Sequence, residues 1–120
     1  MGIISLKGEP KSSQNMYKMT CRGRFATMYI SKQGKDLKES YQWQAKSQWK
    51  KKPIKCDLEI EITLYFGTKR KSDWDNFHKL SMDSLTGIVY EDDSQIQRAV
   101  VEKRYDKANP RIEIEVFPLE

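Results

Sequence analysis

Residues 54–66 carry the strictest pattern in the chain, and they constrain the fold more than any other segment. Polar residues alternate there with apolar ones, and the apolar positions are Ile54, Cys56, Leu58, Ile60, Ile62, Leu64 and Phe66. Strict period two over this length predicts a β-strand with one face on a core and the other face in water. The sheet that contains this strand therefore needs a covering layer on one side only.

A second periodic segment, residues 31–49, predicts a helix that can supply part of this layer. Its apolar residues recur every four positions: Leu37, Tyr41, Ala45 and Trp49. Ser31 fits the N-cap position, and Pro53 after three lysines ends the helix, because the residue before a proline is pushed out of the helical region. We assign Trp49 to the core and leave the role of Trp43 open.

Shorter apolar runs predict the remaining elements. We expect strands at residues 3–6 and 24–30, a polar loop at residues 10–20, and a closing antiparallel pair at residues 95–105 and 111–117 around a turn at residues 106–110. A second helix is indicated by the apolar stripe Phe77, Leu80, Leu85 and Ile88, with Gly87 as its C′ residue.

The resulting order ββαβαββ predicts an α+β fold with two layers, in which two helices pack on one face of a mixed β-sheet. At 120 residues the chain is long enough for a modest core and too short for two, so we expect one domain, residues 1–120.

The charge balance favours a polyanionic partner. Lysine and arginine number 22 against 17 acidic residues, which gives a formal net charge of +5. Basic triplets at residues 50–52 and 69–71 bracket the strict strand, whereas acidic residues gather after it. A basic surface around an acidic pocket suits an enzyme that holds phosphates and cuts at a metal ion.

Cysteine usage and hydropathy predict the cellular setting. Cys21 and Cys56 lack CxxC spacing, and we expect both to be reduced. The chain has no apolar run of signal-peptide or membrane-span length. We therefore expect a soluble cytoplasmic protein without membrane association.

The segment from residue 69 to residue 95 carries the chemical pattern of the chain. Its central charged residues are Asp73, Asp75, Lys79, Asp92 and Asp93. Local helix chemistry accounts for Asp75 as a capping residue and for Lys79 as an ion-pair partner. It leaves the other aspartates without an explanation.

Carboxylates that converge on a cation would explain these aspartates, because Mg²⁺ takes oxygen ligands and is held by one or two carboxylates together with phosphate oxygens. Asp73 and Asp75 can both be ligands only where a strand ends and a helix begins, since residues i and i+2 share a face in extended chain. The chain from Gly87 to Asp93 can span about 20 Å, so Asp93 can return to the start of the helix. A carboxylate supplied across a dimer interface is the alternative.

These residues resemble the signature of the RusA family of Holliday junction resolvases. The resemblance rests on Asp73, Asp75, Asn76, Lys79, Asp83, Leu85 and Gly87, on the run from Tyr90 to Ile96, and on a fainter match at Pro10, Ser12, Asn15 and Tyr17. Trp74 stands where the family more often has an aliphatic residue, and the interval from Asp75 to Asp93 is one residue shorter than in the family pattern.

The resemblance implies a small homodimeric, Mg²⁺-dependent endonuclease that cuts four-way DNA junctions in recombination and repair. It implies metal ligands at Asp73, Asp75 and Asp93, with Asp92 as the second choice for the last of them. Lys79 would stabilise charge on the phosphate, and Mn²⁺ would substitute for Mg²⁺. The expected DNA-binding residues are Lys69, Arg70, Lys71 and Asn15. No small-molecule cofactor is expected.

Two other functions fit parts of the sequence. A non-catalytic DNA- or RNA-binding module explains the basic charge, but carboxylates beside phosphates weaken binding unless a metal neutralises them. A metal-dependent nuclease that acts on another branched DNA or on RNA would carry the same acid cluster. His78, the only histidine, is interpreted as an exposed helical residue rather than a general base.

Overall fold

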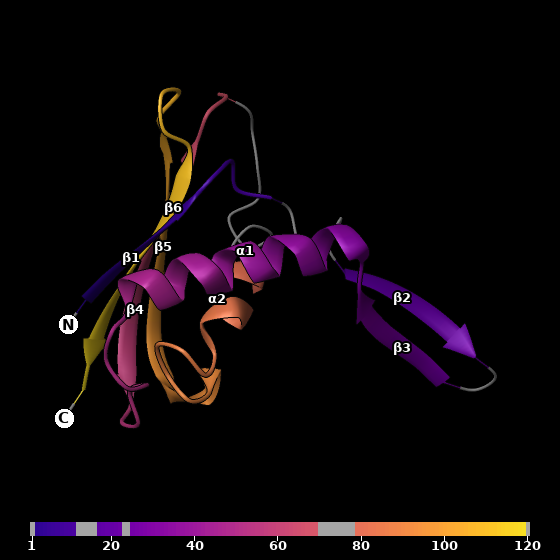
Figure 1. Ribbon diagram of the computed structural model, residues 1–120, viewed down its shortest axis with the longest axis horizontal. Coiled ribbons are helices and arrows are strands. Elements are labelled where there is room, and N and C mark those ends of the chain that lie inside the picture. Colours follow the sequence, from indigo (N-terminus) through magenta and orange to yellow (C-terminus); the bar gives the residue numbers. More distant parts are fainter. Residues whose placement is uncertain (1, 12–16, 23–24, 70–78, 120) are drawn as a thin grey trace.

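The computed structural model describes residues 2–11, 17–22, 25–69 and 79–119. The elements in chain order are β1 (Gly2–Lys7), β2 (Tyr17–Arg22), β3 (Phe25–Ile30), α1 (Lys32–Gln48), β4 (Leu58–Phe66), α2 (Lys79–Leu85), the 3₁₀ helix η3 (Asp93–Gln95), β5 (Ile96–Tyr105) and β6 (Arg111–Pro118). The fold is α+β, as predicted, with one mixed four-stranded sheet and two α-helices among the described residues (Figure 1). None of these helices combines the length and the apolar character that crossing a bilayer requires.

The four-stranded sheet has the order β1-β6-β4-β5, and β4 is the strand on which it is built. β4 pairs antiparallel with β6 on one side and parallel with β5 on the other. A parallel pair needs a long crossover connection, and α2 and η3 lie within that connection. The start of β5 is therefore at the same end of the sheet as the start of β4.

The predicted antiparallel pairing of residues 95–105 with residues 111–117 is wrong. Both strands form, as β5 and β6, but β4 lies between them. The connecting turn passes the end of β4, where the Asp106 amide donates to the Phe66 carbonyl at 2.8 Å. Two strand spacings are only about 10 Å, and five residues can cross this distance. β4 thereby gains a partner on each edge.

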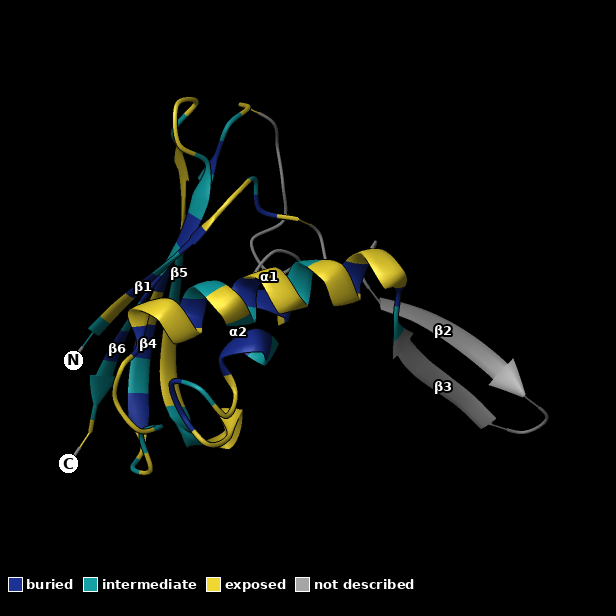
Figure 2. Cartoon of the chain, viewed as in Figure 1, coloured by how far each residue is buried: buried dark blue, intermediate teal, exposed yellow. Residues whose placement is uncertain are grey.

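The alternation predicted for residues 54–66 is confirmed from Leu58 onward. The inward side chains of β4 are all buried: Leu58, Ile60, Ile62, Leu64 and Phe66. Side chains of β1, β6, α1 and α2 complete the core around them, and the helices cover this face (Figure 2). Ile54 lies outside the strand and forms an isolated bridge with Tyr90.

Helix α1 agrees with its sequence prediction at both ends. Ser31 is the N-cap, and its hydroxyl oxygen accepts from the Gly34 amide at 3.1 Å. Trp49 follows the last turn and is 8% exposed, which confirms its assignment to the core. Trp43 is 75% exposed, so the core makes no use of it.

The loop predicted at residues 10–20 is wrong for residues 17–20, which lie in β2. β2 pairs antiparallel with β3, and the two strands make a separate hairpin beyond the start of α1 (Figure 1). Apolar Tyr17, Met19 and Cys21 alternate with polar Lys18, Thr20 and Arg22. This period is that of a strand, but the surrounding polar residues concealed it.

Two glutamines of α1 cover the outer edge of β1, where none of the described strands pairs with it. The Gln48 side chain accepts from the Ser5 amide and donates to the Ser5 carbonyl, both at 2.7 Å. The Gln44 side chain accepts from the Lys7 amide at 2.7 Å. Unpaired edge groups invite pairing with other chains, and one turn of helix here satisfies them within the molecule.

Replacing both Gln44 and Gln48 by alanine should expose this edge. We expect the stability to fall by about 1–2 kcal/mol, because hydrogen bonds are lost without any change in the core. Amide hydrogen exchange at Ser5 and Lys7 should accelerate. Gln33→Ala, at an exposed glutamine of the same helix, is the control. Unchanged exchange at both amides in the double variant would contradict this role.

Candidate active site

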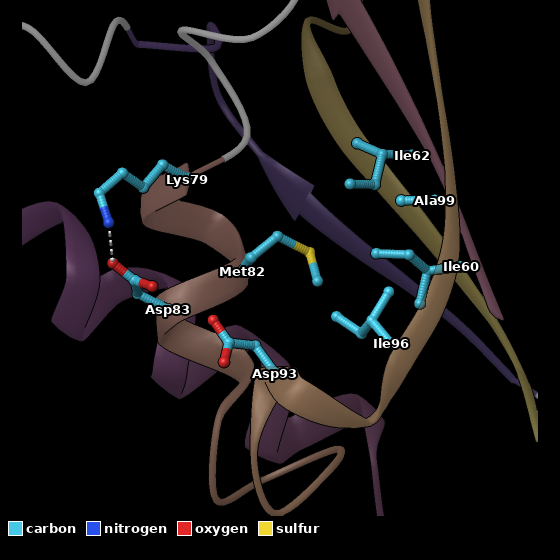
Figure 3. A pocket seen from close by; sticks show the side chains of 8 residues that line it. All are labelled: Ile60, Ile62, Lys79, Met82, Asp83, Asp93, Ile96 and Ala99. Carbon is cyan, nitrogen blue, oxygen red and sulfur yellow. Dashed lines mark ion pairs between the residues drawn. The ribbon is translucent and has the colours of Figure 1, made fainter. Parts of the chain in front are cut away.

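A pocket of about 420 Å³ opens between α2 and the neighbouring strands β4 and β5. Its lining comprises Ile60, Ile62, Lys79, Met82, Asp83, Asp93, Ile96 and Ala99 (Figure 3). The charged side chains come from α2 and from the turn before β5, and the apolar side chains of β4 and β5 form the wall across from them (Figure 3). Met82 of α2 points toward this wall (Figure 3). The pocket therefore has an anionic rim that contains one lysine, and an apolar floor.

Lys79 and Asp83 form an ion pair on one face of α2. The Lys79 Nζ atom lies 3.5 Å from the Asp83 Oδ2 atom, at the i, i+4 spacing, and the side chains are 49% and 32% exposed. Pairs this exposed contribute little to stability. The pair instead holds an ammonium group at the rim of the pocket, where a ligand can reach it.

Asp92 and Asp93 are adjacent in the chain but have different surroundings. The Asp92 carboxylate is the N-cap of η3 and accepts from both the amide and the hydroxyl of Ser94. These bonds, first of all the one from the hydroxyl, lower the pKa of Asp92 below its usual value. The Asp93 carboxylate lines the pocket and faces the α2 residues (Figure 3).

Gln95 fixes the turn that carries these two aspartates. Its side-chain oxygen accepts from the Asp92 amide at 2.8 Å, which completes a capping box. Its side-chain nitrogen donates to the carbonyls of Ile54 and Cys56, each at 2.8 Å. One amide group therefore ties the turn before β5 to the chain that enters β4.

The opposite side of the pocket is fixed by Tyr90. Its ring is fully buried, and its hydroxyl donates to the Met82 carbonyl of α2 at 2.7 Å. Burial raises the pKa of Tyr90 above its usual value, so the hydroxyl keeps its proton and remains a donor. The bridge between Ile54 and Tyr90 joins this anchor to the segment that Gln95 holds.

The structure brings together some of the residues that the sequence singled out. Lys79 and Asp93 lie in one pocket. Lys69 lies elsewhere, with its ammonium 5.1 Å from the centre of the Tyr105 ring at the end of β5. The remaining predicted site residues fall outside the described part of the chain: Asn15, Arg70, Lys71, Asp73 and Asp75. His78, which was predicted to be an exposed helical residue, falls outside it as well.

Sequence reasoning counted Asp83 among the residues of the RusA resemblance but gave it no role in the site, and it did not anticipate the apolar floor. The i, i+4 spacing from Lys79 was the available signal that Asp83 shares its face of the helix. Met82, Ile96 and Ala99 carried no comparable signal, because an apolar residue that lines a pocket has the same pattern as one in the core.

The pocket offers carboxylate oxygens of the kind that a hard divalent cation takes. Mg²⁺ usually needs only one or two carboxylates beside water and phosphate oxygens, and Asp83 and Asp93 supply such donors. Within the described residues no group of three or more His, Cys, Asp or Glu side chains could hold a metal ion. The described residues therefore offer two carboxylates to a divalent cation, whose other ligands would be phosphate and water.

A basic α+β protein with carboxylates and a lysine around one pocket is typical of enzymes that cleave phosphodiester bonds with a metal ion. The chain belongs to the RusA family of endodeoxyribonucleases, because the family profile described as endodeoxyribonuclease RusA matches residues 7–117. This match confirms the resemblance drawn from the segment around Asp73 and Lys79, and it identifies the protein as an endodeoxyribonuclease. No curated protein matches the chain.

Gln95→Ala should loosen the turn that presents Asp93. We expect a loss of about 1–3 kcal/mol in stability, because the Ile54 and Cys56 carbonyls and the Asp92 amide lose their partner. DNA cleavage should fall more steeply than the fraction of folded protein. Thermal melting and cleavage of DNA, measured side by side, check this expectation.

Gln97→Ala is the matched control, since Gln97 is an exposed glutamine two residues further along. Gln95→Glu should behave no better than Gln95→Ala, because it turns a carboxylate oxygen toward two carbonyl oxygens. A Gln95→Ala variant that melts and cleaves like the control would show that the turn keeps its conformation without the Gln95 side chain.

Proposed function

We propose that the protein is a Mg²⁺-dependent endonuclease that resolves four-way DNA junctions by paired hydrolysis of phosphodiester bonds in recombination and repair. The observation that carries this proposal is the pocket in which the Asp93 carboxylate lies beside the Lys79–Asp83 pair, in a chain of the RusA family. Residues 1–120 act as one endonuclease domain.

Asp93 is one ligand of the metal, and Asp73 and Asp75 are the others. The last two precede Lys79 by six and four residues, so a short stretch of chain joins them to a pocket residue. The hydrogen-bonded capping role of Asp92 supports the choice of Asp93 over its neighbour. Bound Mg²⁺ supplies a Lewis acid for the phosphate and lowers the pKa of a water molecule; Mn²⁺ substitutes for it.

Lys79 stabilises the negative charge that develops on the phosphate oxygens during attack. Its side chain is about half exposed, and its ion pair with Asp83 is a weak surface pair. A phosphate can therefore take the place of Asp83 at little cost. Lys69, Arg70, Lys71 and Asn15 contact the DNA outside the pocket, where cations replace counterions condensed on the backbone.

Asp93→Asn should abolish or severely reduce Mg²⁺-dependent cutting of a synthetic four-way junction, because it removes one ligand charge at unchanged side-chain size. Asp73→Asn and Asp75→Asn should behave alike. Junction binding in EDTA should persist or tighten, since negative charge beside the phosphate is lost. Gel assays of cutting and binding, with a matched duplex and RNA as further substrates, measure both effects.

Asp92→Asn is the matched control for the neighbouring position. Asparagine caps helices as well as aspartate does, so this variant should fold and cut like wild type. If Asp92→Asn is inactive and Asp93→Asn is active, the ligand assignment is reversed. If wild type binds junctions but never cuts them with Mg²⁺ or Mn²⁺, the protein is a non-catalytic binding module.

The active species should be a homodimer, because a pair of cuts on opposing strands needs two pockets related by a twofold axis. Light scattering should give twice the 14.2 kDa mass of the chain. On a junction in a small supercoiled circle, both strands should be cut within one binding event. A strictly monomeric protein that still makes paired cuts would contradict this proposal.

A further inference from the structure

One face of β5 remains uncovered beside the pocket. Along β4 and β5 the partners Ile60 and Ala99, Leu64 and Lys103, and Phe66 and Tyr105 lie opposite one another. Because side chains alternate between faces, Ala99, Val101, Lys103 and Tyr105 share the face on which the pocket lies. Val101 is partly exposed and the other three are exposed, so α1 and α2 do not extend over this face (Figure 2).

This uncovered face forms a path that leads from the pocket to the end of β5. Ala99 lines the pocket, and Tyr105 ends the strand six residues further on. The distance along the strand is about 20 Å. A polymer held at the pocket therefore meets the side chains of Val101, Lys103 and Tyr105 if it follows β5.

The two faces of β5 carry different sets of charged residues. The face away from the helices carries Arg98, which pairs with Glu59, and Arg104, which pairs with Glu102. On the uncovered face, from Ala99 to Tyr105, no residue is acidic, and Lys103 is basic. Between Ala99 and Tyr105 this face of β5 therefore contributes a basic side chain and no acidic one, which suits a polyanion.

The path ends at an aromatic ring with a cation over one of its faces. Tyr105 is 46% exposed, and the Lys69 ammonium lies 5.1 Å from the centre of its ring. Lys69 is itself exposed. Exposed aromatic rings between cations are the usual platform on which nucleic-acid bases stack, since every base has a π-face and a phosphate attached to it.

We propose that this face of β5 guides a DNA strand from the pocket, and that Tyr105 stacks on a base exposed at the branch point while Lys69 and Lys103 contact the phosphates beside it. The inference rests on the proposed junction cleavage, to which it adds a second contact point that selects branched DNA over duplex. In a continuous duplex each base is covered by its stacked neighbours, whereas stacking is interrupted at a branch point, so Tyr105 favours substrates whose strands part near the pocket.

The test is the binding of a labelled four-way junction and of a matched duplex, by fluorescence anisotropy in EDTA. Tyr105→Ala should weaken junction binding by about ten-fold and leave duplex binding within about two-fold. Tyr105→Phe should bind like wild type, because it keeps the ring. Trp43→Ala, which removes an exposed aromatic residue of α1, should change neither affinity.

A 2-aminopurine base placed in turn at each position around the branch point reports stacking directly. Wild type should change its fluorescence at one or two positions, and Tyr105→Ala should abolish that change. Lys103→Ala should flatten the salt dependence of junction binding, with Lys46→Ala on α1 as its control.

The inference is overturned if Tyr105→Ala binds the junction like wild type, if Tyr105→Phe is as weak as Tyr105→Ala, or if Tyr105→Ala converts a dimer to a monomer. In the last case the face is an interface between copies of the chain. The proposed cleavage fails separately: a wild type that binds junctions through Tyr105 but never cuts them with Mg²⁺ refutes the nuclease and leaves the β5 contact standing.

Discussion

The pairing of β4 on both of its edges is the constraint on which the rest of the structure depends. One edge joins β4 to β6 antiparallel, and the other joins it to β5 parallel. The parallel edge forces the chain to return along the length of the sheet before β5 can begin, and α2 lies on that return path. The pocket forms where the returning chain turns back into the sheet. The position of Asp93 therefore follows from the parallel direction of β5 relative to β4.

The sequence predicted those parts of the fold in which a local pattern and the tertiary structure agree. The alternation that ends at Phe66, the Ser31 cap and the placement of Trp49 all depend on side chains that are periodic or close in the chain. The partner of β5 did not follow from such patterns, because alternation specifies which face of a strand is buried but not which strand lies beside it. β2 was missed for a related reason, since a six-residue alternation bordered by polar residues carries too little signal.

Sequence reasoning about the site was limited in a similar way. Lys79 and Asp93 could be singled out because charged residues in an unusual order need an explanation. The distinction between Asp92 and Asp93 needs the geometry of η3, in which one carboxylate turns back to its own backbone and the other turns to the pocket. The floor residues Met82 and Ala99 could not be distinguished from core residues, because a pocket wall and a core are equally apolar in sequence.

The pairing of β1 has a consequence for how the chain folds as it is synthesised. β1 hydrogen-bonds to β6 alone among the described strands, and residues 2–7 meet residues 111–116. On a ribosome, β1 therefore emerges long before its strand partner. α1 follows much sooner, and in the complete structure its glutamines bind the other edge of β1. The helix can therefore contact β1 before the sheet is completed.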